Sequence, residues 1–474
     1  MFKKHMSLIL ALVLSAYTVS CGSYGTETKV TTESDTSVTT AAPVPEYEFR
    51  RDWEGDTIAF LNYDNPFSMN AKITTDSENG DILNDAKYKR MVKLEEKMGV
   101  KLEETSVAHG EYLNFARNTL TAGEDTYDLL YVNEHDLNPL SSEGYLLNLM
   151  ELENLNLDED WWLHELNALA AIGGTLYCAE GYSNLLAVDT INILLFNEDI
   201  AEKISLDAPY SLVKEEKWTL DKFGEYLKAG AALNLGADIP DDDNIWNYDQ
   251  PGNGAACLSL LVGAGESSFA IKDGKVTLTA GSEHFYNACD KIASLMTQNQ
   301  PYMYSKIRYG VSERFKRNQA LFSYGEIVTT QQLRSEDFTF GVLPSPKYDE
   351  SQERYYCRKS WTTAGVTVPV TAEAPEKSAA FADALSYLSR DIVWSVYRGL
   401  VLEQKNLRND ESIEMLDIIL RSSVPSLDSI YNIGSDMIWE IYDKLIRGEN
   451  DISSVIASNK ASIEAALEEL NAKR

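Results

Sequence analysis

The sequence predicts an α/β protein in which helices cover a mainly parallel sheet and the chain is long enough for two lobes. From residue 57 onward, short apolar segments of strand character alternate with amphipathic segments of helical character, and this alternation is typical of parallel sheets. The 474 residues exceed what one hydrophobic core usually serves. Hydrophobic residues make up 44% and charged residues 24% of the chain, the balance of an ordinary globular protein.

The first strand–helix–strand unit lies at residues 57–105. The compact apolar segment 57–62 is the first expected strand, and 100–105 alternates apolar and polar residues like a second strand. Between them an apolar stripe recurs at three- and four-residue spacing, formed by Tyr88, Met91, Leu94 and Met98. Gly99 stands where a glycine commonly ends a helix. The unit therefore predicts two strands joined by a helix.

The same alternation continues along the chain. Further expected elements are a helix at 111–122, a strand at 127–132, a helix or turn at 140–149, buried strands at 173–178 and 191–196, and a final helix at 455–470. Another helix is expected after Pro375, and its apolar face consists of Phe381, Ala384, Leu385 and Leu388.

Trp218 and Thr219 begin a well-signalled helix. Thr219 is the expected N-cap residue, and Asp221 lies in the first turn, where a negative charge is favourable. Trp218 precedes the cap and is placed to pack against Phe223 one turn into the helix.

Residues 1–20 have the pattern of an export signal. A basic start, Lys3-Lys4, precedes an apolar run at 8–14, and small residues then lead to Cys21. The apolar run is too short to span a hydrocarbon layer of roughly 30 Å. The pattern resembles a bacterial lipoprotein signal, which implies that Cys21 becomes the lipidated first residue of the mature chain. An ordinary cleaved signal that leaves a free secreted protein is the alternative.

Residues 21–46 are expected to form a flexible tether between Cys21 and the folded body. The segment is rich in Ser, Thr, Gly and Pro and has no apolar period, so it buries too little surface to offset the entropy of ordering it. The lipoprotein pattern departs from the usual one at Thr18, where leucine is common. The position of the spacer directly after the cysteine favours the anchored interpretation.

The net charge restricts the class of partner. With 42 basic and 74 acidic residues, the chain carries a formal charge of −32. This balance argues against nucleic acid and against adsorption on anionic lipid, which both require cationic surfaces. Attachment to a membrane must therefore come from Cys21.

Four cysteines remain in the body and are widely spaced: Cys178, Cys257, Cys289 and Cys357. An even number permits two disulfides in an exported protein. Burial as small apolar side chains is the preferred interpretation, because a chain of this size does not need covalent cross-links.

Catalytic, metal and cofactor motifs are missing from the sequence. It contains no G-x-S-x-G elbow, no phosphate-binding G-x-x-x-x-G-K-[ST] and no complete G-x-G-x-x-G. His164-Glu165 begins like a zinc-protease motif, but Ala168 takes the place of the second histidine. The acidic segment 241–244 lacks the glycine and the distal glutamate of a calcium loop. We therefore expect no catalytic residue, no resident metal and no cofactor.

Aromatic and polar side chains gather at expected loop positions. Sugars offer apolar C–H faces and a rim of hydroxyl groups, so their sites combine aromatic rings with amide and carboxylate acceptors. The candidate ligand-binding residues are Asn62, Asn65, Asn133, Glu134, Tyr182, Asn184, Trp246, Tyr248, Tyr324 and Glu326, and His135 lies next to them.

The order of several short motifs resembles a known family. The motifs are the opening unit at 57–105, YDLLY at 127–131, SEGYLLN at 142–148, GTLYCAE at 174–180, LFNED at 195–199, WTLD at 218–221, FKRNQALFSY at 315–324, FGVLPSP at 340–346 and GVTV at 365–368. Together they resemble the family-1 extracellular solute-binding proteins, the sugar-binding lipoproteins of ABC importers that are related to maltose-binding protein. Glu198 and Asn318 depart from that pattern, which usually has Lys and Gly there.

The resemblance implies a two-lobed periplasmic-binding-protein fold of type II, with hinge crossings and a central ligand cleft. Lobe one would comprise 47–185 plus 364–402, and lobe two 186–363 plus 403–474. The candidate residues above would face the cleft, with Trp361 near a crossing. The ligand would be a carbohydrate, and an oligosaccharide is expected. A permease of an ABC importer would receive it from a monomeric, non-enzymatic protein lipid-anchored on the extracytoplasmic face of the membrane.

Two alternatives come from other functional classes. One is a surface-anchored glycan hydrolase, since 74 acidic residues allow many carboxylate pairs and none of them stands out. The other is a ligand sensor that presents its closed form to a signalling receptor instead of an importer.

Overall fold

The computed structural model describes residues 47–65, 70–231, 245–249, 255–299, 313–403 and 410–472. The chain divides into the units Met1–Glu48 and Phe49–Arg474, and the second unit carries every helix and strand given below. No helix within the described ranges is long and apolar enough to cross a membrane. The export signal, Cys21, nearly all of the tether and the acidic segment 241–244 lie outside the described residues.

The first sheet has the strand order β11-β3-β1-β2. Its strands are β1 (Thr57–Asp64), β2 (Lys101–Ala108), β3 (Leu129–Asn133) and β11 (Ala364–Thr367). Strand β1 pairs in parallel with both β2 and β3, and β11 pairs antiparallel with β3. The expected strand–helix–strand unit is therefore confirmed, and a strand from residues 364–367 completes this sheet.

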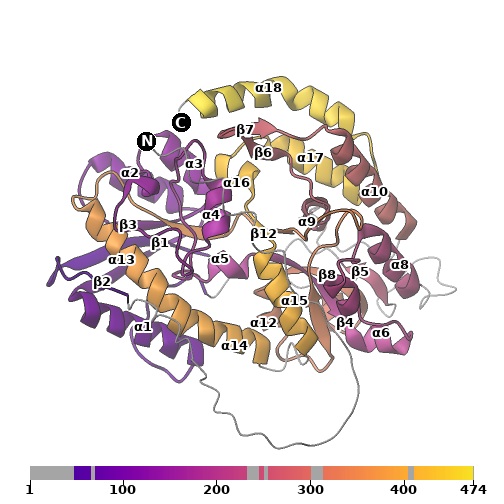
Figure 1. Cartoon of the computed structure of the whole chain (residues 1–474), viewed down its shortest axis with the longest axis horizontal. Coiled ribbons are helices and arrows are strands. Elements are labelled where there is room, and N and C mark those ends of the chain that lie inside the picture. Colours follow the sequence, from indigo (N-terminus) through magenta and orange to yellow (C-terminus); the bar gives the residue numbers. More distant parts are fainter. Residues whose placement is uncertain are drawn as a thin grey trace, which may run out of the picture. The chain divides into compact units, whose positions relative to one another are not determined.

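Helices of the first sheet and its neighbourhood follow the sequence pattern closely (Figure 1). They are α1 (Ile82–Met98), α2 (Tyr112–Ala122), α3 (Glu134–Ser142), α4 (His164–Ala170), α13 (Pro375–Leu388) and α14 (Ser395–Glu403), with the short turn η1 (Leu149–Glu151) and the π-helical turn η3 (Ser389–Trp394). Gly99 ends α1 with a φ of 74°, in the left-handed region that glycine adopts easily. Pro375 begins α13, and the expected apolar face of this helix is buried.

The second sheet has the order β5-β8-β4-β9. Its strands are β5 (Trp246–Asp249), β8 (Ala320–Glu326), β4 (Asn192–Asn197) and β9 (Phe340–Leu343). Strands β5 and β8 pair in parallel, whereas β4 pairs antiparallel with both of its neighbours, β8 and β9. The prediction of a mainly parallel sheet is therefore wrong for this half of the protein. All six residues of β4 are buried, so the strand is covered on both faces in either direction and its composition does not encode its orientation.

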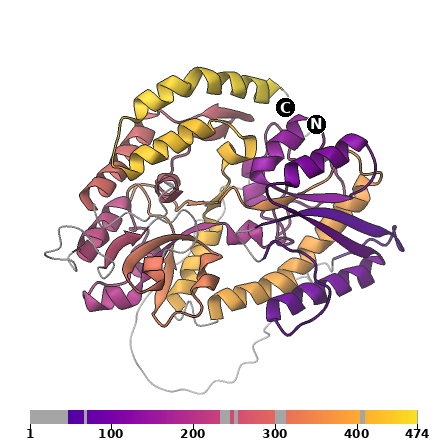
Figure 2. The same ribbon diagram turned by 180° about the vertical axis from the view of Figure 1, so that it is seen from behind.

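The remaining elements surround the second sheet or connect the two sheets (Figure 2). The helices are α5 (Leu186–Asp189), α6 (Glu198–Lys203), α7 (Tyr210–Lys214), α8 (Leu220–Ala231), α9 (Ala255–Gly263), α10 (Glu283–Asn299), α11 (Glu313–Lys316), α12 (Thr329–Gln332), α15 (Asp410–Arg421), α16 (Leu427–Tyr431), α17 (Ser435–Ile446) and α18 (Ile452–Ala472). The short strands are β6 (Phe269–Lys272), β7 (Lys275–Leu278), β10 (Cys357–Arg358) and β12 (Ser423–Val424).

Helix α8 begins as the sequence predicts. The Thr219 hydroxyl accepts a hydrogen bond from Lys222 N at 3.3 Å, and the Trp218 and Phe223 rings meet edge to face with centroids 5.9 Å apart. The cap and the aromatic contact fix where the chain enters the helix.

One local prediction is wrong. Residues 173–178 form no strand, because Gly173 and Gly174 both adopt positive φ angles and turn the chain. Residues 140–149, expected as a helix or turn, contain the end of α3 and the turn that follows it. Helix α3 begins at Glu134, because the Asn133 side chain accepts a hydrogen bond from the Asp136 backbone and caps the helix there.

The four cysteines of the body are free thiols. Cys257, Cys289 and Cys357 are fully buried, so the preferred interpretation of these residues as small apolar side chains is confirmed. His164 and Glu165 are exposed on α4, as expected for two solvated helix residues.

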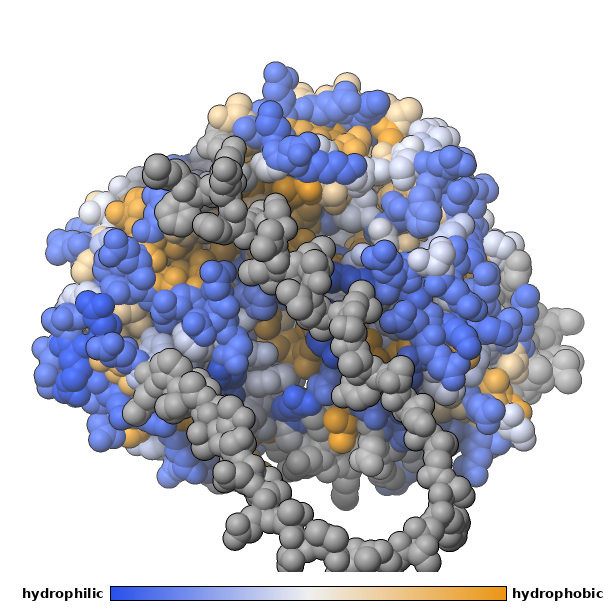
Figure 3. Space-filling view, in the orientation of Figure 1, coloured by the Kyte–Doolittle hydropathy of each residue, from blue (hydrophilic) through white to orange (hydrophobic). Residues whose placement is uncertain are grey.

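Hydrophilic residues predominate on the face shown in Figure 3, and hydrophobic residues show mostly between them. Within the described residues, the exposed large apolar side chains are scattered: Ile82 and Val92 lie ten residues apart on α1, and the others lie on separate segments, namely Phe115, Met150, Leu169, Val370 and Trp439. Apolar residues scattered in this way do not indicate a docking patch.

Candidate functional site

Two strand segments that connect the sheets lie side by side. Residues 189–192 lead into β4, and residues 357–361 lead from β10 toward β11. Ile191 and Lys359 form an antiparallel bridge between them. We call these two segments the connecting strands. They bring side chains from both sheets into one neighbourhood.

Four rings gather where the strands of the first sheet end. Tyr63 lies at the end of β1, His109 follows β2, His135 follows β3, and Trp361 precedes β11. The ring centroids are 6.0 Å apart for Tyr63–His109, 5.4 Å for His109–Trp361 and 6.1 Å for His135–Trp361. Ligands of open α/β sheets bind outside the carboxyl ends of the strands. We call this group the aromatic wall, and the half-buried Trp361 lies between its two imidazoles.

Carboxylates lie close to the aromatic wall. Burial raises the pKa of Tyr63 strongly, and the charges of Asp136, Glu326 and Glu134 raise it further, which places all three acids within electrostatic reach of this ring. Asp136 Oδ1 also lies 3.4 Å from His135 Nδ1, and this hydrogen bond raises the pKa of His135. The neighbourhood therefore contains more acidic than basic groups.

Glu134 is buried without a partner. Only 4% of the residue is exposed, and neither carboxylate oxygen has a hydrogen-bond partner. Burial raises the pKa of Glu134 to about 8, although the charges of Lys359 and Arg358 oppose this shift. A buried carboxylate without donors is unfavourable in the free protein, so Glu134 is suited to accept hydrogen bonds from a ligand.

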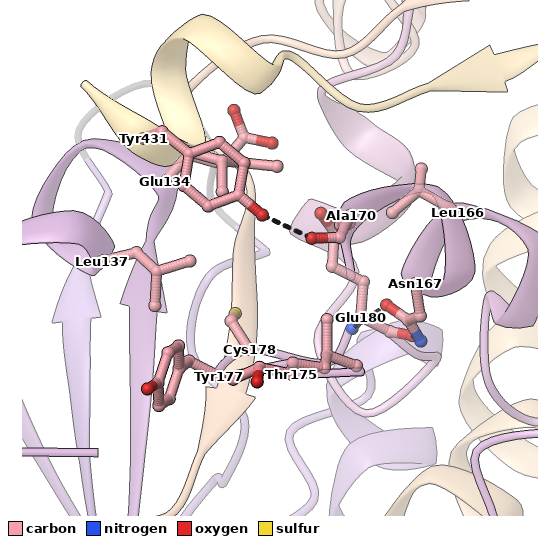
Figure 4. A pocket seen from close by; sticks show the side chains of 12 residues that line it. Glu134, Leu137, Leu166, Asn167, Ala170, Thr175, Tyr177, Cys178, Glu180 and Tyr431 are labelled. Atoms are coloured by element: carbon pink, nitrogen blue, oxygen red, sulfur yellow. Dashed lines mark hydrogen bonds between the residues drawn. The ribbon is translucent and has the colours of Figure 1, made fainter. Parts of the chain in front are cut away.

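Glu134 lines a small cavity that Figure 4 shows from close by. Its volume is about 30 Å³, room for one or two water molecules. The lining residues come from α3, α4, the segment 175–180 and α16: Glu134, Leu137, Leu166, Asn167, Ala170, Thr175, Leu176, Tyr177, Cys178, Glu180, Ile430 and Tyr431. The Tyr431 hydroxyl donates to Ala170 O at 2.5 Å and joins α16 to α4. This cavity is far smaller than a sugar ring needs.

A buried ion pair lies behind the same cavity. Lys359 Nζ donates to the Glu180 carboxylate, which also accepts from the Thr363 hydroxyl at 3.1 Å. Burial lowers the pKa of Lys359 to about 7, and the charge of Glu134 opposes this shift. Because Glu180 already has partners, Glu134 is the acid of the cavity that remains available.

Among the predicted ligand residues, Asn62 and Asn133 hold the backbone in place. Asn62 Nδ2 donates to Ala71 O at 2.8 Å and to Glu104 Oε1 at 2.7 Å. Asn133 Oδ1 accepts from Asp136 N at 3.0 Å as the cap of α3. Both residues are fully buried, and their side chains form hydrogen bonds that stabilise the local structure.

Asn65 and Asn184 have similar local roles. Asn65 Nδ2 donates to Tyr63 Oη at 3.0 Å and to Thr362 O at 3.2 Å, beside the aromatic wall. Asn184 Oδ1 accepts from Leu186 N at 3.0 Å where α5 begins, while its Nδ2 has no protein partner. Their predicted contact with a ligand stays a prediction.

Tyr182 and Tyr248 pack against other aromatic rings. Tyr182 stacks on Trp394 with centroids 5.3 Å apart. Tyr248 is fully buried and meets the Phe223 ring edge to face at 5.4 Å. Packing alone explains the position of Tyr248.

The structure separates Trp246 from Tyr324 and Glu326. Trp246 pairs with Ala320, at the opposite end of β8 from Glu326. The Arg314 guanidinium lies 4.1 Å from the centroid of the Trp246 ring. Tyr324 is buried, while the half-buried Glu326 lies at the end of β8 that meets the connecting strands. Glu134 and Glu326 both act electrostatically on Tyr63 of the aromatic wall, to which Trp361 belongs, whereas Trp246 lies at the other end of β8.

Four residues of this neighbourhood escaped the sequence interpretation: His109, Asn192, Arg358 and Lys359. Asn192 has no exposed surface, and neither end of its amide has a protein partner. For His109, the one sequence feature that could have indicated a site residue is its position directly after a strand. The other three lie in the connecting strands, whose pairing depends on the tertiary fold. No group of acidic, histidine or cysteine side chains in the described part of the chain is placed to hold a metal ion.

Comparisons with known proteins reveal similar structures but no similar sequences. No protein-family model matches the sequence, and no curated protein matches it. The ABC substrate-binding protein Lmo0181 from Listeria monocytogenes, solved with cycloalternan, superposes with a TM-score of 0.57 at 15% identity, over 87% of this chain and 99% of that one. The cyclic α-maltosyl-1,6-maltose binding protein from Arthrobacter globiformis gives 0.59 and 15%, over 87% and 98%.

A third similar structure is UgpB from Mycobacterium tuberculosis, solved in complex with glycerophosphocholine. It has a TM-score of 0.56 and 14% identity, over 82% of this chain and 97% of that one. The similarity at this level of identity shows the fold alone, the α/β fold of two-lobed periplasmic binding proteins.

Proposed function

We propose that the protein is a non-enzymatic solute-binding protein that captures a carbohydrate, in particular an oligosaccharide, between two lobes outside the cytoplasm and delivers it to an ABC importer. The observation that carries this proposal is the match of 87% of the chain to nearly the whole length of two binding proteins, one solved in complex with cycloalternan and one that binds cyclic α-maltosyl-1,6-maltose. We assign lobe one to 47–185 plus 364–402 and lobe two to 186–363 plus 403–474. The permease is the expected partner, and the protein acts as a monomer.

The chemistry of the site supports a sugar. Trp361 offers a half-buried aromatic face, and stacking on such a face suits the C–H groups of a sugar ring. Glu134 and Glu326 supply acceptors that hydroxyl groups can satisfy. A ligand that contacts both lobes favours the closed arrangement over the open one, and this difference in affinity drives capture.

Titration calorimetry of the folded body with a panel of glycans tests the proposal. The panel contains linear and cyclic α-glucans, β-glucans, acidic glycans and glycerophosphocholine, the ligand that UgpB binds. Saturable heat with at least one glycan is the expected result. If glycerophosphocholine alone binds, the proposed ligand is a phosphodiester and not a sugar. A lack of heat with every compound would refute carbohydrate capture.

We further propose that the protein is lipid-anchored through Cys21, with residues 21–46 as its tether. The basic and apolar segments before Cys21 and the polar spacer after it support this proposal. Replacement of Cys21 by alanine should move the protein from the membrane fraction to the soluble fraction and leave ligand affinity unchanged. Retention of the Cys21→Ala variant at the membrane would contradict the anchor.

A further inference from the structure

The connecting strands contain a fully buried amide that has no partner. Asn192 has no exposed surface, and both its Oδ1 and Nδ2 lack a protein partner. Asparagine normally forms several hydrogen bonds when it is buried, because it contributes two donors and one strong acceptor. An amide left unpaired costs stability at both ends.

The strand register places Arg358 and Glu326 beside this amide. Asn192 lies directly opposite Glu326 in the antiparallel pair of β4 and β8. On its other side, the bridge between Ile191 and Lys359 sets Asn192 next to Arg358 one step along the same register. Residues that lie opposite each other in antiparallel strands share one face of the sheet. Glu326, Asn192 and Arg358 therefore form a row on one face, which we call the polar row.

Arg358 is also incompletely paired. It is 6% exposed, and its Nε has no protein partner. Burial raises the pKa of Glu326 to about 7. The hydrogen bond from Ser360 and the charge of Arg358 oppose this shift. The half-buried Glu326 is the end of the row that solvent reaches. Along the polar row, the Glu326 carboxylate is an acceptor, the Asn192 amide is both a donor and an acceptor, and the Arg358 guanidinium is a donor.

We propose that the polar row is the part of the ligand site that binds hydroxyl groups of a neutral polyhydroxylated ligand, with Asn192 as a specificity-determining residue. This inference rests on the proposed function for the identity of the ligand. A hydroxyl group both donates and accepts, and so it satisfies the carboxylate, the amide and the guanidinium in turn. An anionic group would instead be repelled by the carboxylate of Glu326. The carboxylates of Glu134 and Asp428, which interact electrostatically with Arg358, would repel it as well.

The chain offers a matched control for Asn192. Asn167 is equally buried, at 3% exposed, but its amide is fully used: Nδ2 donates to Glu180 O at 3.0 Å and Oδ1 accepts from Glu180 N at 2.8 Å. Leucine has nearly the shape of asparagine without its polar atoms. The same substitution at the two positions therefore separates an amide that stabilises the fold from one that serves a ligand.

Thermal unfolding of ligand-free Asn192→Leu and Asn167→Leu is the first measurement. We expect Asn167→Leu to lower the melting temperature by about 4 °C or more, because it leaves two backbone groups unpaired. Asn192→Leu should leave the melting temperature unchanged or raise it. A decrease for Asn192→Leu as large as that for Asn167→Leu would overturn the proposal, since it would mean that Asn192 is paired in the free protein. Asn192→Val repeats the test in case leucine does not fit, and failure of both variants to fold also overturns it.

Calorimetry with the neutral glycan that binds the wild type best is the second measurement. Asn192→Leu should weaken binding at least tenfold, and an acidic counterpart of that glycan should bind wild type more weakly than the neutral form. Unchanged affinity in Asn192→Leu, or preference for the acidic glycan, would overturn the inference while the proposed function stands. If no glycan binds the wild type, the proposed function fails, and the melting comparison alone still decides whether Asn192 is an unpaired site residue.

Discussion

Asp383 on α13 and Glu134 on α3 are both buried carboxylates, and they differ in every other respect. Asp383 has no exposed surface and accepts hydrogen bonds from Asn156 N at 3.0 Å, from Asn156 Nδ2 at 2.7 Å and from the indole Nε1 atoms of Trp161 and Trp162 at 3.0 and 2.8 Å. Glu134 is nearly as buried and accepts none.

The difference separates what the fold requires from what a ligand requires. The donors around Asp383 replace its lost water and bind the 156–162 segment to α13, so that this carboxylate stabilises the fold. Burial without donors keeps Glu134 partly protonated near neutral pH. Groups held at a cost in stability cluster at functional sites, and Glu134 lies beside the polar row and the aromatic wall.

The largest effect is expected for Asp383→Leu. This change leaves two indole N–H groups and the Asn156 amide without an acceptor, and it should lower the free energy of unfolding by about 3–5 kcal/mol. Urea unfolding followed by circular dichroism measures the loss. Asp290→Leu on the exposed side of α10 makes the same chemical change in solvent and should alter stability by less than about 0.5 kcal/mol. Equal effects of the two variants would show that the bonds to Asp383 do not matter for stability.

An effect of opposite sign is expected for Glu134→Gln. The folded protein holds a proton on Glu134 up to a pKa of about 8, whereas the unfolded chain releases it near 4.5. The contribution of this group to stability therefore falls as pH rises from about 4.5 to 8, because folding must take up a proton. Glutamine mimics the protonated acid, so Glu134→Gln should be more stable than wild type by about 2–3 kcal/mol at pH 7 and about equal to it at pH 4.

Unfolding midpoints of wild type and Glu134→Gln across pH 4–8 measure this difference. The other titrating groups, Glu326 included, are present in both proteins. Because the charges of Glu134 and Lys359 affect each other's pKa, the difference between the curves reports Glu134 together with its coupling to Lys359. Parallel curves at all pH values would mean that Glu134 has partners in solution and does not belong with the unpaired groups.

Much of the fold follows from local pattern, and the exceptions have physical reasons. Strands β1 to β3 and the helices α1, α8 and α13 were predictable because the apolar periodicity, Gly99, Pro375 and the Thr219 cap all act within a few residues. The direction of β4 was not predictable, since a strand buried on both faces carries no mark of orientation. The turn at Gly173 and Gly174 interrupts a segment whose composition alone resembles a strand.

The site was predictable in part. Glu134, Glu326 and Trp361 follow or precede strands whose ends face the crossings, and their position in the sequence was enough to identify them as candidates. Nothing in the sequence distinguishes Asn192 and Arg358 from other strand residues. Only the antiparallel register shows that they lie side by side. The burial of Glu134 without a hydrogen-bond partner also appears only in three dimensions.

The smallest effect concerns Asn133, the residue next to Glu134 and a predicted ligand residue itself. Asn133→Ala removes the cap of α3, whose Oδ1 accepts from Asp136 N at 3.0 Å, and should lower the free energy of unfolding by about 1 kcal/mol. Asn133→Ser keeps a capping oxygen and should recover most of this loss. If Asn133 belongs with the paired groups, Asn133→Ser also binds the glycan as tightly as wild type in calorimetry. Weaker glycan binding by Asn133→Ser at unchanged stability would instead mean that Asn133 contacts the ligand directly. Asn133 would then belong with Glu134 among the groups that serve a ligand.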